Sequence, residues 1–273
     1  MKKDLLFFCS VLFFLNGQGQ TYHGLPSSGL NTTGAYSLRF TDAFSCSDNP
    51  ACLGGIRHLL CGVLAGNQWM LEGLNNYAFA ASFPLGSAGM GLVLQQSGDE
   101  AFKEQSLELA YGRNLGKLDI GIVFDFLRDQ AAGYESAPFI SSGIGLRYRV
   151  NEKLMVGWEL GIPVSGKIGD TNPEEAPQYF RMGFGYQMED DLFLSLQIEK
   201  QSGQPADFFG YIVYQYGDHF IFSAGVRSVS GSFILKTGWR KNRLCIEPGL
   251  VYEPVLGLST SLMLLWEIKN NAE

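Results

Sequence analysis

The stretch LMVGWELGIPVSGKIGDTNPEEAPQYFRMGFGYQMEDDLFLSLQIEK, residues 154–200, decides the fold. Large apolar side chains alternate there with Gly, Glu, Arg and Gln in three segments, at residues 154–164, 180–187 and 192–199. A period of two places the two sets on opposite faces of a β-strand. The pattern is typical of a soluble β-sandwich, and also of a transmembrane β-barrel with lipid outside and a polar lumen.

The same alternation recurs along most of the chain and gives about fourteen strands in all. An even number is expected when both ends of a bacterial barrel lie in the periplasm. The phase of residues 208–216 stays open, because that segment is apolar on both faces. The further candidate strands are residues 57–66, 75–85, 88–96, 103–111, 118–127, 139–150, 208–216, 220–228, 233–240, 244–252 and 256–268.

Two features of the strand ends favour the barrel. Tight turns, which mark the periplasmic side, alternate with longer polar loops, and seven aromatic residues lie beside the tight turns, in or near the lipid-facing phase. A row of aromatic side chains at one height is an interfacial girdle, which a sandwich does not need. We therefore predict an all-β fold, an antiparallel transmembrane β-barrel of about 14 strands with a short N-terminal plug-like segment. The girdle residues are Phe83, Tyr111, Tyr148, Tyr186, Tyr214, Trp239 and Trp266.

The start of the chain indicates export. Lys2 and Lys3 precede an apolar run at residues 5–15, and small and polar residues follow it. This order describes a secretory signal peptide. With the barrel pattern, it predicts a protein of the outer membrane of a Gram-negative bacterium. The expected organisation is a signal peptide at 1–20, a periplasmic or plug segment at 21–56, a transmembrane barrel at 57–268 and a periplasmic tail at 269–273.

Composition limits the partners. The chain has 273 residues and a formal net charge of −7. Because no basic stripe is present, a nucleic-acid partner is excluded. Outer-membrane lipid, including lipopolysaccharide, is the expected surrounding partner.

Charged residues fall on the predicted lumen face. Glu159, Arg181 and Glu199 alternate in sign on successive strands. They form either a charge network that satisfies a polar lumen or a constriction that selects solutes by charge. The full predicted lumen network is Glu108, Asp119, Asp125, Arg147, Glu159, Arg181 and Glu199.

Glycines also gather on the inward face. A strand glycine marks either curvature or the close approach of another backbone. The second explanation makes room for residues 21–56 as a partial plug, and the first needs no plug. The glycines are Gly89, Gly91, Gly121, Gly143, Gly145, Gly157, Gly161, Gly183, Gly185, Gly225, Gly238 and Gly249.

Reactive side chains give no catalytic pattern. Cys46 and Cys52 flank Asn49-Pro50, so in an oxidising compartment they form either a loop-closing disulfide or two free thiols. No histidine stands in a recognisable catalytic constellation, so we expect no enzyme and no cofactor. Acidic residues at 170, 174 and 175 fit a solvated loop better than a cation site, and no metal is expected.

Short motifs lead to a family. Asn49-Pro50-Ala51 with Leu53, Leu109-Ala110-Tyr111-Gly112-Arg113, Ala176-Pro177, Arg181 with Gly183 and Tyr186, and Glu199-Lys200 resemble FadL-like outer-membrane barrels. The nearest members are the PorV/PorQ-like and PorP/SprF-like barrels associated with type IX secretion. Where relatives often place Asn-Pro after the seventh strand, this chain has Ile162-Pro163, so the resemblance transfers no ligand site.

Two functions follow from this resemblance. The first is an accessory or docking component of protein secretion or surface assembly, with secretion-machinery or cargo proteins as partners. The alternative is a FadL-like channel for small or hydrophobic molecules. A cargo platform would have longer outer loops, and a transporter would have an apolar pocket. This chain has short outer loops and polar or small lumen residues, and of the two functions we favour the docking role.

Overall fold

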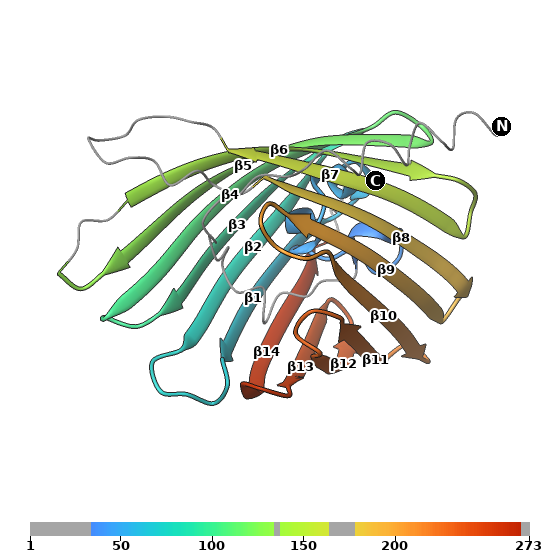
Figure 1. The fold of residues 1–273 in the computed structure, drawn as a ribbon. Coiled ribbons are helices and arrows are strands. Elements are labelled where there is room, and N and C mark those ends of the chain that lie inside the picture. Colours follow the sequence, from blue (N-terminus) through green and yellow to red (C-terminus); the bar gives the residue numbers. More distant parts are fainter. Residues whose placement is uncertain (1–33, 134–136, 164–177, 269–273) are drawn as a thin grey trace.

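The computed structural model describes residues 34–133, 137–163 and 178–268, and within them fourteen antiparallel strands close into one barrel (Figure 1). The predicted fold class is therefore confirmed. The proposed signal peptide, the C-terminal tail and the acidic loop with residues 170, 174 and 175 lie outside the described residues. The strands are β1 (Leu59–Asn67), β2 (Asn75–Leu85), β3 (Ala88–Gly98), β4 (Phe102–Asn114), β5 (Leu118–Ala131), β6 (Ala137–Arg149), β7 (Leu154–Pro163), β8 (Tyr179–Glu189), β9 (Leu192–Gln201), β10 (Asp207–Tyr216), β11 (Phe220–Arg227), β12 (Phe233–Lys241), β13 (Leu244–Glu253) and β14 (Gly257–Ile268).

Each strand pairs with its neighbours in sequence, and β1 pairs with β14 to close the ring, with Leu64 opposite Met263. The alternation of the sequence becomes an alternation of exposure. On β5, Ile122 is 44% exposed and the next residue, Val123, is 2% exposed. A lipid-facing outer surface and a filled interior therefore follow from the same two-residue period.

The two ends of the barrel differ. Short turns join β4 to β5 and β12 to β13, with Gly116 at φ +92° and Asn242 at φ +57° in the left-handed region that tight turns require. Longer connections, such as residues 68–74, lie at the other end. The seven predicted girdle aromatics all lie on the outer face near the short-turn end, with exposures from 37% at Tyr111 to 55% at Trp266.

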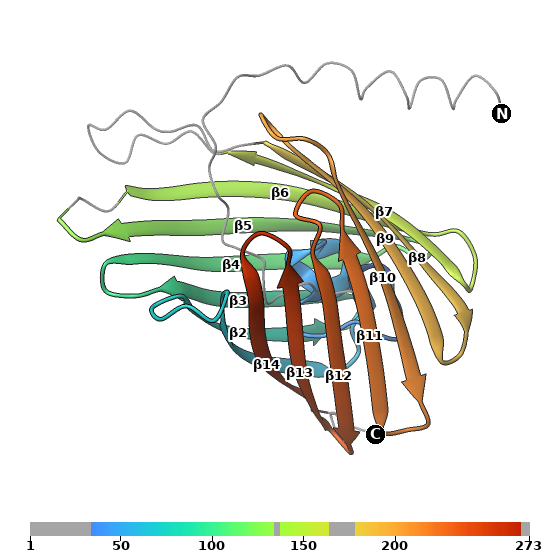
Figure 2. The same ribbon diagram turned by 60° about the horizontal axis from the view of Figure 1, so that its bottom comes forward.

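Residues 34–56, called the N-terminal segment below, lie inside the ring of strands (Figures 1 and 2). The segment folds as three 3₁₀ turns, η2 (Gly34–Tyr36), η3 (Ser45–Ser47) and η4 (Pro50–Gly55). Asn49 caps η4, because its side-chain oxygen accepts a hydrogen bond from the Ala51 N–H at 3.0 Å. Pro50 follows at the first helical position, where a missing N–H costs nothing. None of the helices in the described part of the chain is both long and apolar enough to cross a membrane.

A first prediction tests which face meets lipid. Replacing Ile122 by Arg places a charge on the outer face and should lower the free energy of unfolding by about 2–4 kcal/mol if the site lies near the bilayer midplane. Ile122→Leu is the matched control and should change little, because it conserves volume and polarity. Denaturant titration of the protein folded into vesicles measures both. Equal stability of the Arg and Leu variants would contradict the orientation.

Candidate functional site

The N-terminal segment packs against glycine residues on the inner face of the strands. A Cβ atom added at any of nine strand glycines would lie under 3.0 Å from an atom of residues 36–53. Seven of them belong to the inward set predicted from sequence, and Gly62 and Gly112 were missed. Gly143, Gly161, Gly225, Gly238 and Gly249 instead face barrel atoms, so the plug accounts for only part of the glycine pattern. The nine are Gly62, Gly89, Gly91, Gly112, Gly121, Gly145, Gly157, Gly183 and Gly185.

Arg147 of β6 holds the start of the segment. Its Nε and Nη2 donate to Asp119 Oδ2 of β5 at 3.0 and 2.8 Å. Its Nη1 donates to the carbonyl oxygens of Ala35 and Ser37 at 2.9 and 3.3 Å. The side chain is 1% exposed. A buried guanidinium of this kind needs both a counter-charge and hydrogen-bond acceptors, and here it has them from two different elements.

Arg181 of β8 holds the middle of the segment in a similar way. Its Nη1 donates to the carbonyl oxygens of Ser47 and Asp48, both at 3.0 Å, and to Glu159 Oε2 at 2.9 Å. Its Nε donates to Glu199 Oε2 at 3.2 Å. The structure thus brings together Glu159, Arg181 and Glu199.

The remaining predicted lumen charges, Glu108 and Asp125, lie directly opposite each other on β4 and β5. Ser141 Oγ donates to Asp125 Oδ2 at 2.9 Å. The predicted network is therefore arranged as an Arg147–Asp119 pair, an Arg181-centred triad and this pair of carboxylates. The contacts of both arginines with carbonyl oxygens of the N-terminal segment were not foreseen.

Cys46 and Cys52 are free thiols in the structure, which corrects the disulfide expectation. Both are buried, and Cys46 Sγ is directed toward the Ala43 carbonyl oxygen at 3.6 Å. The two 3₁₀ turns that carry the cysteines seat them in the apolar cluster with Leu53, Val93 and Val123. The segment is therefore held by packing and hydrogen bonds.

The opposite inner wall carries an apolar cluster, with Gln197 and Gln215 buried on the same face, so this part of the lumen is less polar than expected. Large side chains from β9 to β13 form a buried cluster on the inner face. The sequence signal was the segment at 208–216, which is apolar on both faces because one face meets lipid and the other lines the lumen. The cluster contains Phe193, Phe209, Tyr211, Val213, Ile221, Ile234, Cys245 and Val251, with Phe40 and Leu265 packed against it.

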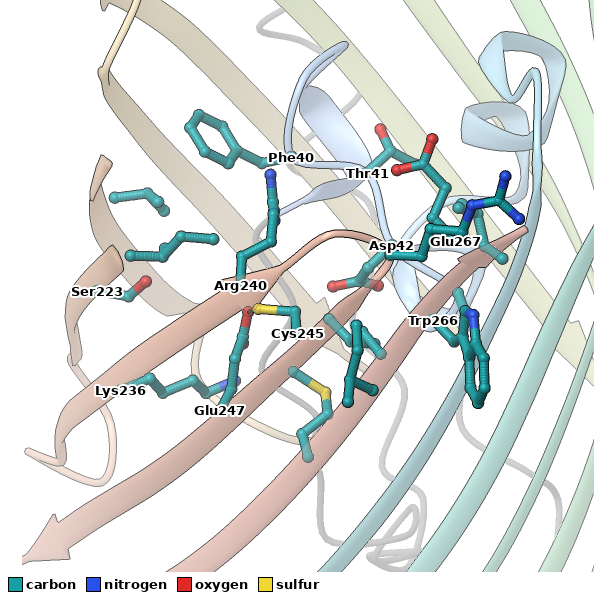
Figure 3. Close-up of a pocket in the computed structure, with 18 of the residues that line it drawn as sticks. Phe40, Thr41, Asp42, Ser223, Lys236, Arg240, Cys245, Glu247, Trp266 and Glu267 are labelled. Carbon is teal, nitrogen blue, oxygen red and sulfur yellow. Dashed lines mark hydrogen bonds between the residues drawn. The ribbon is translucent and has the colours of Figure 1, made fainter. Parts of the chain in front are cut away.

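A cavity of about 100 Å³ lies between this wall and the N-terminal segment. Figure 3 shows Phe40, Thr41 and Asp42 of the segment with Ser223, Lys236, Cys245 and Glu247 of the strands around it. Apolar lining comes from Tyr211, Val213, Ile221, Met263 and Leu265. The cavity is thus apolar toward the wall and carries charged groups beside the segment.

Asp42 is the acidic group that the segment contributes to this cavity, beside the basic Arg39. Burial raises the pKa of its carboxyl to about 6, and the charge of Glu247 adds to the rise. Hydrogen bonds from Ser45 Oγ and the Phe44 N–H at 3.0 and 2.9 Å oppose the shift. The docked segment therefore favours the protonated carboxyl.

The fold of this chain is similar to that of several solved barrels. No protein-family model and no curated protein matches the chain. The barrel is similar to the CymD monoaromatic hydrocarbon channel, with a TM-score of 0.66 and 13% identity over 89% of this chain and 97% of that chain. It is also similar to the toluene transporters TbuX of Ralstonia pickettii (TM-score 0.59, 13% identity, 83% and 93% covered) and TodX of Pseudomonas putida (0.59, 10%, 82% and 93%). At these identities the likeness is one of fold. It shows no link to type IX secretion.

A second prediction concerns the Arg147 anchor. Arg147→Gln leaves Asp119 buried without its counter-charge and should lower the free energy of unfolding by about 3–5 kcal/mol. The double variant Asp119→Asn/Arg147→Gln should recover part of this loss, because no unpaired charge remains. Denaturant titration in vesicles measures both variants. A double variant less stable than Arg147→Gln would show that the pair does not act as a unit.

A third prediction uses Asp42. Because its pKa is raised in the docked state, docking of residues 40–46 should weaken as pH rises from 3.8 to about 6 and change little above that. Asp42→Asn keeps an acceptor for the Phe44 N–H and should remove this pH dependence. Hydrogen exchange of residues 40–46 at several pH values measures it. The same pH profile in wild type and variant would exclude Asp42 as the titrating group.

Proposed function

We propose that this chain is an outer-membrane channel for small apolar molecules. The observation that carries the proposal is the apolar inner wall of β9 to β13, which continues into a cavity beside the N-terminal segment. A channel for polar solutes needs a hydrated lumen with polar lining. Large apolar side chains on the inner face lower the free energy of an apolar solute instead, by about 25 cal/mol for each Å² removed from water.

The similarity in fold to known channels also supports a channel for small apolar molecules. The similar solved structures are described as a monoaromatic hydrocarbon channel and toluene transporters. Together with the apolar wall, this favours small hydrocarbons, with aromatic rings among them, as the solute class. It also supports a location in the outer membrane of a Gram-negative bacterium, with lipopolysaccharide and phospholipid around the barrel.

The docking role in secretion, which the sequence resemblance favoured, is the weaker reading. The apolar wall and the cavity face the interior of the barrel, where no protein cargo fits. Two of the outer loops within the described residues, 99–101 and 254–256, have three residues each, and residues 68–74 form a longer one. Neither feature supports a cargo platform.

A fourth prediction tests the proposal. Vesicles or porin-deficient cells that carry the protein should take up toluene faster than the same preparation without it, while uptake of a polar sugar of similar size should not rise. Val213→Asn, which places an amide on the apolar inner wall, should lower toluene uptake. Ile212→Val, one residue away on the lipid face, is the matched control and should leave it unchanged. Absence of toluene uptake by the wild-type protein would contradict the proposal.

A further inference from the structure

The N-terminal segment closes only one side of the lumen. Its η4 turn packs on β3, β4, β5 and β6, and η2 packs on β7 and β8. Toward β10 to β14 the segment contributes residues 39–43, and the cavity of Figure 3 lies there. The 3₁₀ turns therefore contact one side of the lumen, and the cavity of Figure 3 lies on the other. A second cavity of about 160 Å³ lies beside residues 36–39 and strands β6 to β9.

The cavity joins the apolar wall to the rim of the barrel. Tyr211, Val213 and Ile221 belong both to the apolar cluster and to the cavity lining. Asn242 and Arg243, which also line it, form the turn between β12 and β13 at the short-turn end. The lining thus runs without interruption from the inner wall to the end that faces the periplasm under the proposed function.

The strand ladder is closed around the lumen. Each of the fourteen strands is hydrogen-bonded to two neighbours. A register shift at Gln187 and Glu189 lies at the short-turn end, and between β12 and β13 the pairing is interrupted where Thr237 and Gly238 face Glu247 and Pro248. Opening a ladder inside the bilayer exposes unpaired backbone groups to hydrocarbon, at several kcal/mol for each group. Rotation of side chains around an existing cavity costs far less.

We infer that an apolar solute leaves the barrel through the cavity between residues 39–43 and strands β10 to β14, toward the short-turn end, and not through the barrel wall. This inference rests on the proposed function and adds the exit route. Two aromatic contacts lie beside the route, the second of them near the short-turn end. Tyr211 packs its ring over Gly225, and Phe40 packs on Phe193 with ring centroids 5.7 Å apart.

The size of the cavity narrows the solute class. A dry cavity of about 150 Å³ lined by aliphatic and aromatic side chains accommodates benzene. The space here, about 100 Å³, approaches that volume and needs only a modest movement of Phe40 or Tyr211 to reach it. The route therefore fits compact solutes with one ring. Arg240, Asn242 and Arg243 line the cavity at the short-turn end and make this end less favourable for an apolar solute, which promotes release.

The test obstructs the cavity after folding. Ser223 lines the cavity, and Ala224 is the next residue on the opposite, outer face of β11. Ser223→Cys and Ala224→Cys are made in a Cys61→Ala/Cys245→Ala background, folded into vesicles and treated with benzyl methanethiosulfonate. Toluene uptake is measured before treatment, after it, and after a reductant removes the benzylthio group, and mass spectrometry measures the extent of labelling.

Labelling of Ser223→Cys should abolish most of the toluene uptake, and the reductant should restore it. Labelling of Ala224→Cys should leave uptake unchanged. Full labelling of Ser223→Cys with no loss of uptake would overturn the exit route, and so would failure of the reagent to reach this position, because the cavity would then be closed to a ring of toluene size. Lack of uptake by the wild-type protein would instead count against the proposed function.

Discussion

The closed hydrogen-bond ladder is the constraint on which the rest of this structure depends. Lipid provides no partners for backbone N–H and C=O groups, so a β-sheet in a membrane must close on itself. Closure with fourteen strands encloses a space too wide for the barrel's own side chains alone to fill at the density of a protein interior. In this chain the space is filled in two different ways. The N-terminal segment occupies the side of β3 to β8, and large apolar side chains occupy the side of β9 to β13.

An inserted segment brings its own backbone into the lumen, and its 3₁₀ turns leave carbonyl oxygens without partners inside the segment. Arg147 and Arg181 supply donors for three of them, at Ala35, Ser47 and Asp48. Arg147 also donates to the Ser37 carbonyl oxygen, which accepts a hydrogen bond from Thr41 Oγ1 as well. Asp119, Glu159 and Glu199 then keep the two guanidinium groups paired where water is scarce. The inward charges thus have a structural reason that is independent of any solute: they satisfy the backbone of the plug, and the glycines opposite let that backbone approach.

Much of this was accessible from the sequence, because the two-residue period is a local signal. It located every strand to within a few residues and placed the girdle aromatics and the inward charges on their faces. The partners of Arg147 and Arg181 were not accessible, since they lie 110 to 134 positions away in the chain and are backbone atoms without a sequence signature. The apolar wall was hidden for a different reason. When both faces of a strand are apolar, as at residues 208–216, periodicity gives no phase. The spacing of Cys46 and Cys52 permitted a bridge, but only the turn geometry shows where each thiol is directed.

The apolar wall admits two explanations, and the cavity separates them. Large inner side chains fill volume that the plug leaves free, and this alone would make Phe193, Phe209 and Ile234 large and apolar. If packing were their only role, however, large side chains should continue to the rim, because an unfilled void lowers stability in proportion to its volume. Beside residues 39–43 the filling is interrupted, although Ile221 and Cys245 lie nearer the rim. Ser223 is small there, Lys236 and Glu247 are charged, and about 100 Å³ stays open. A larger apolar residue at position 223 would fill this space. A wall selected only for packing has no reason to leave a void where it meets the plug, whereas a wall that conducts apolar solutes past the plug requires one there.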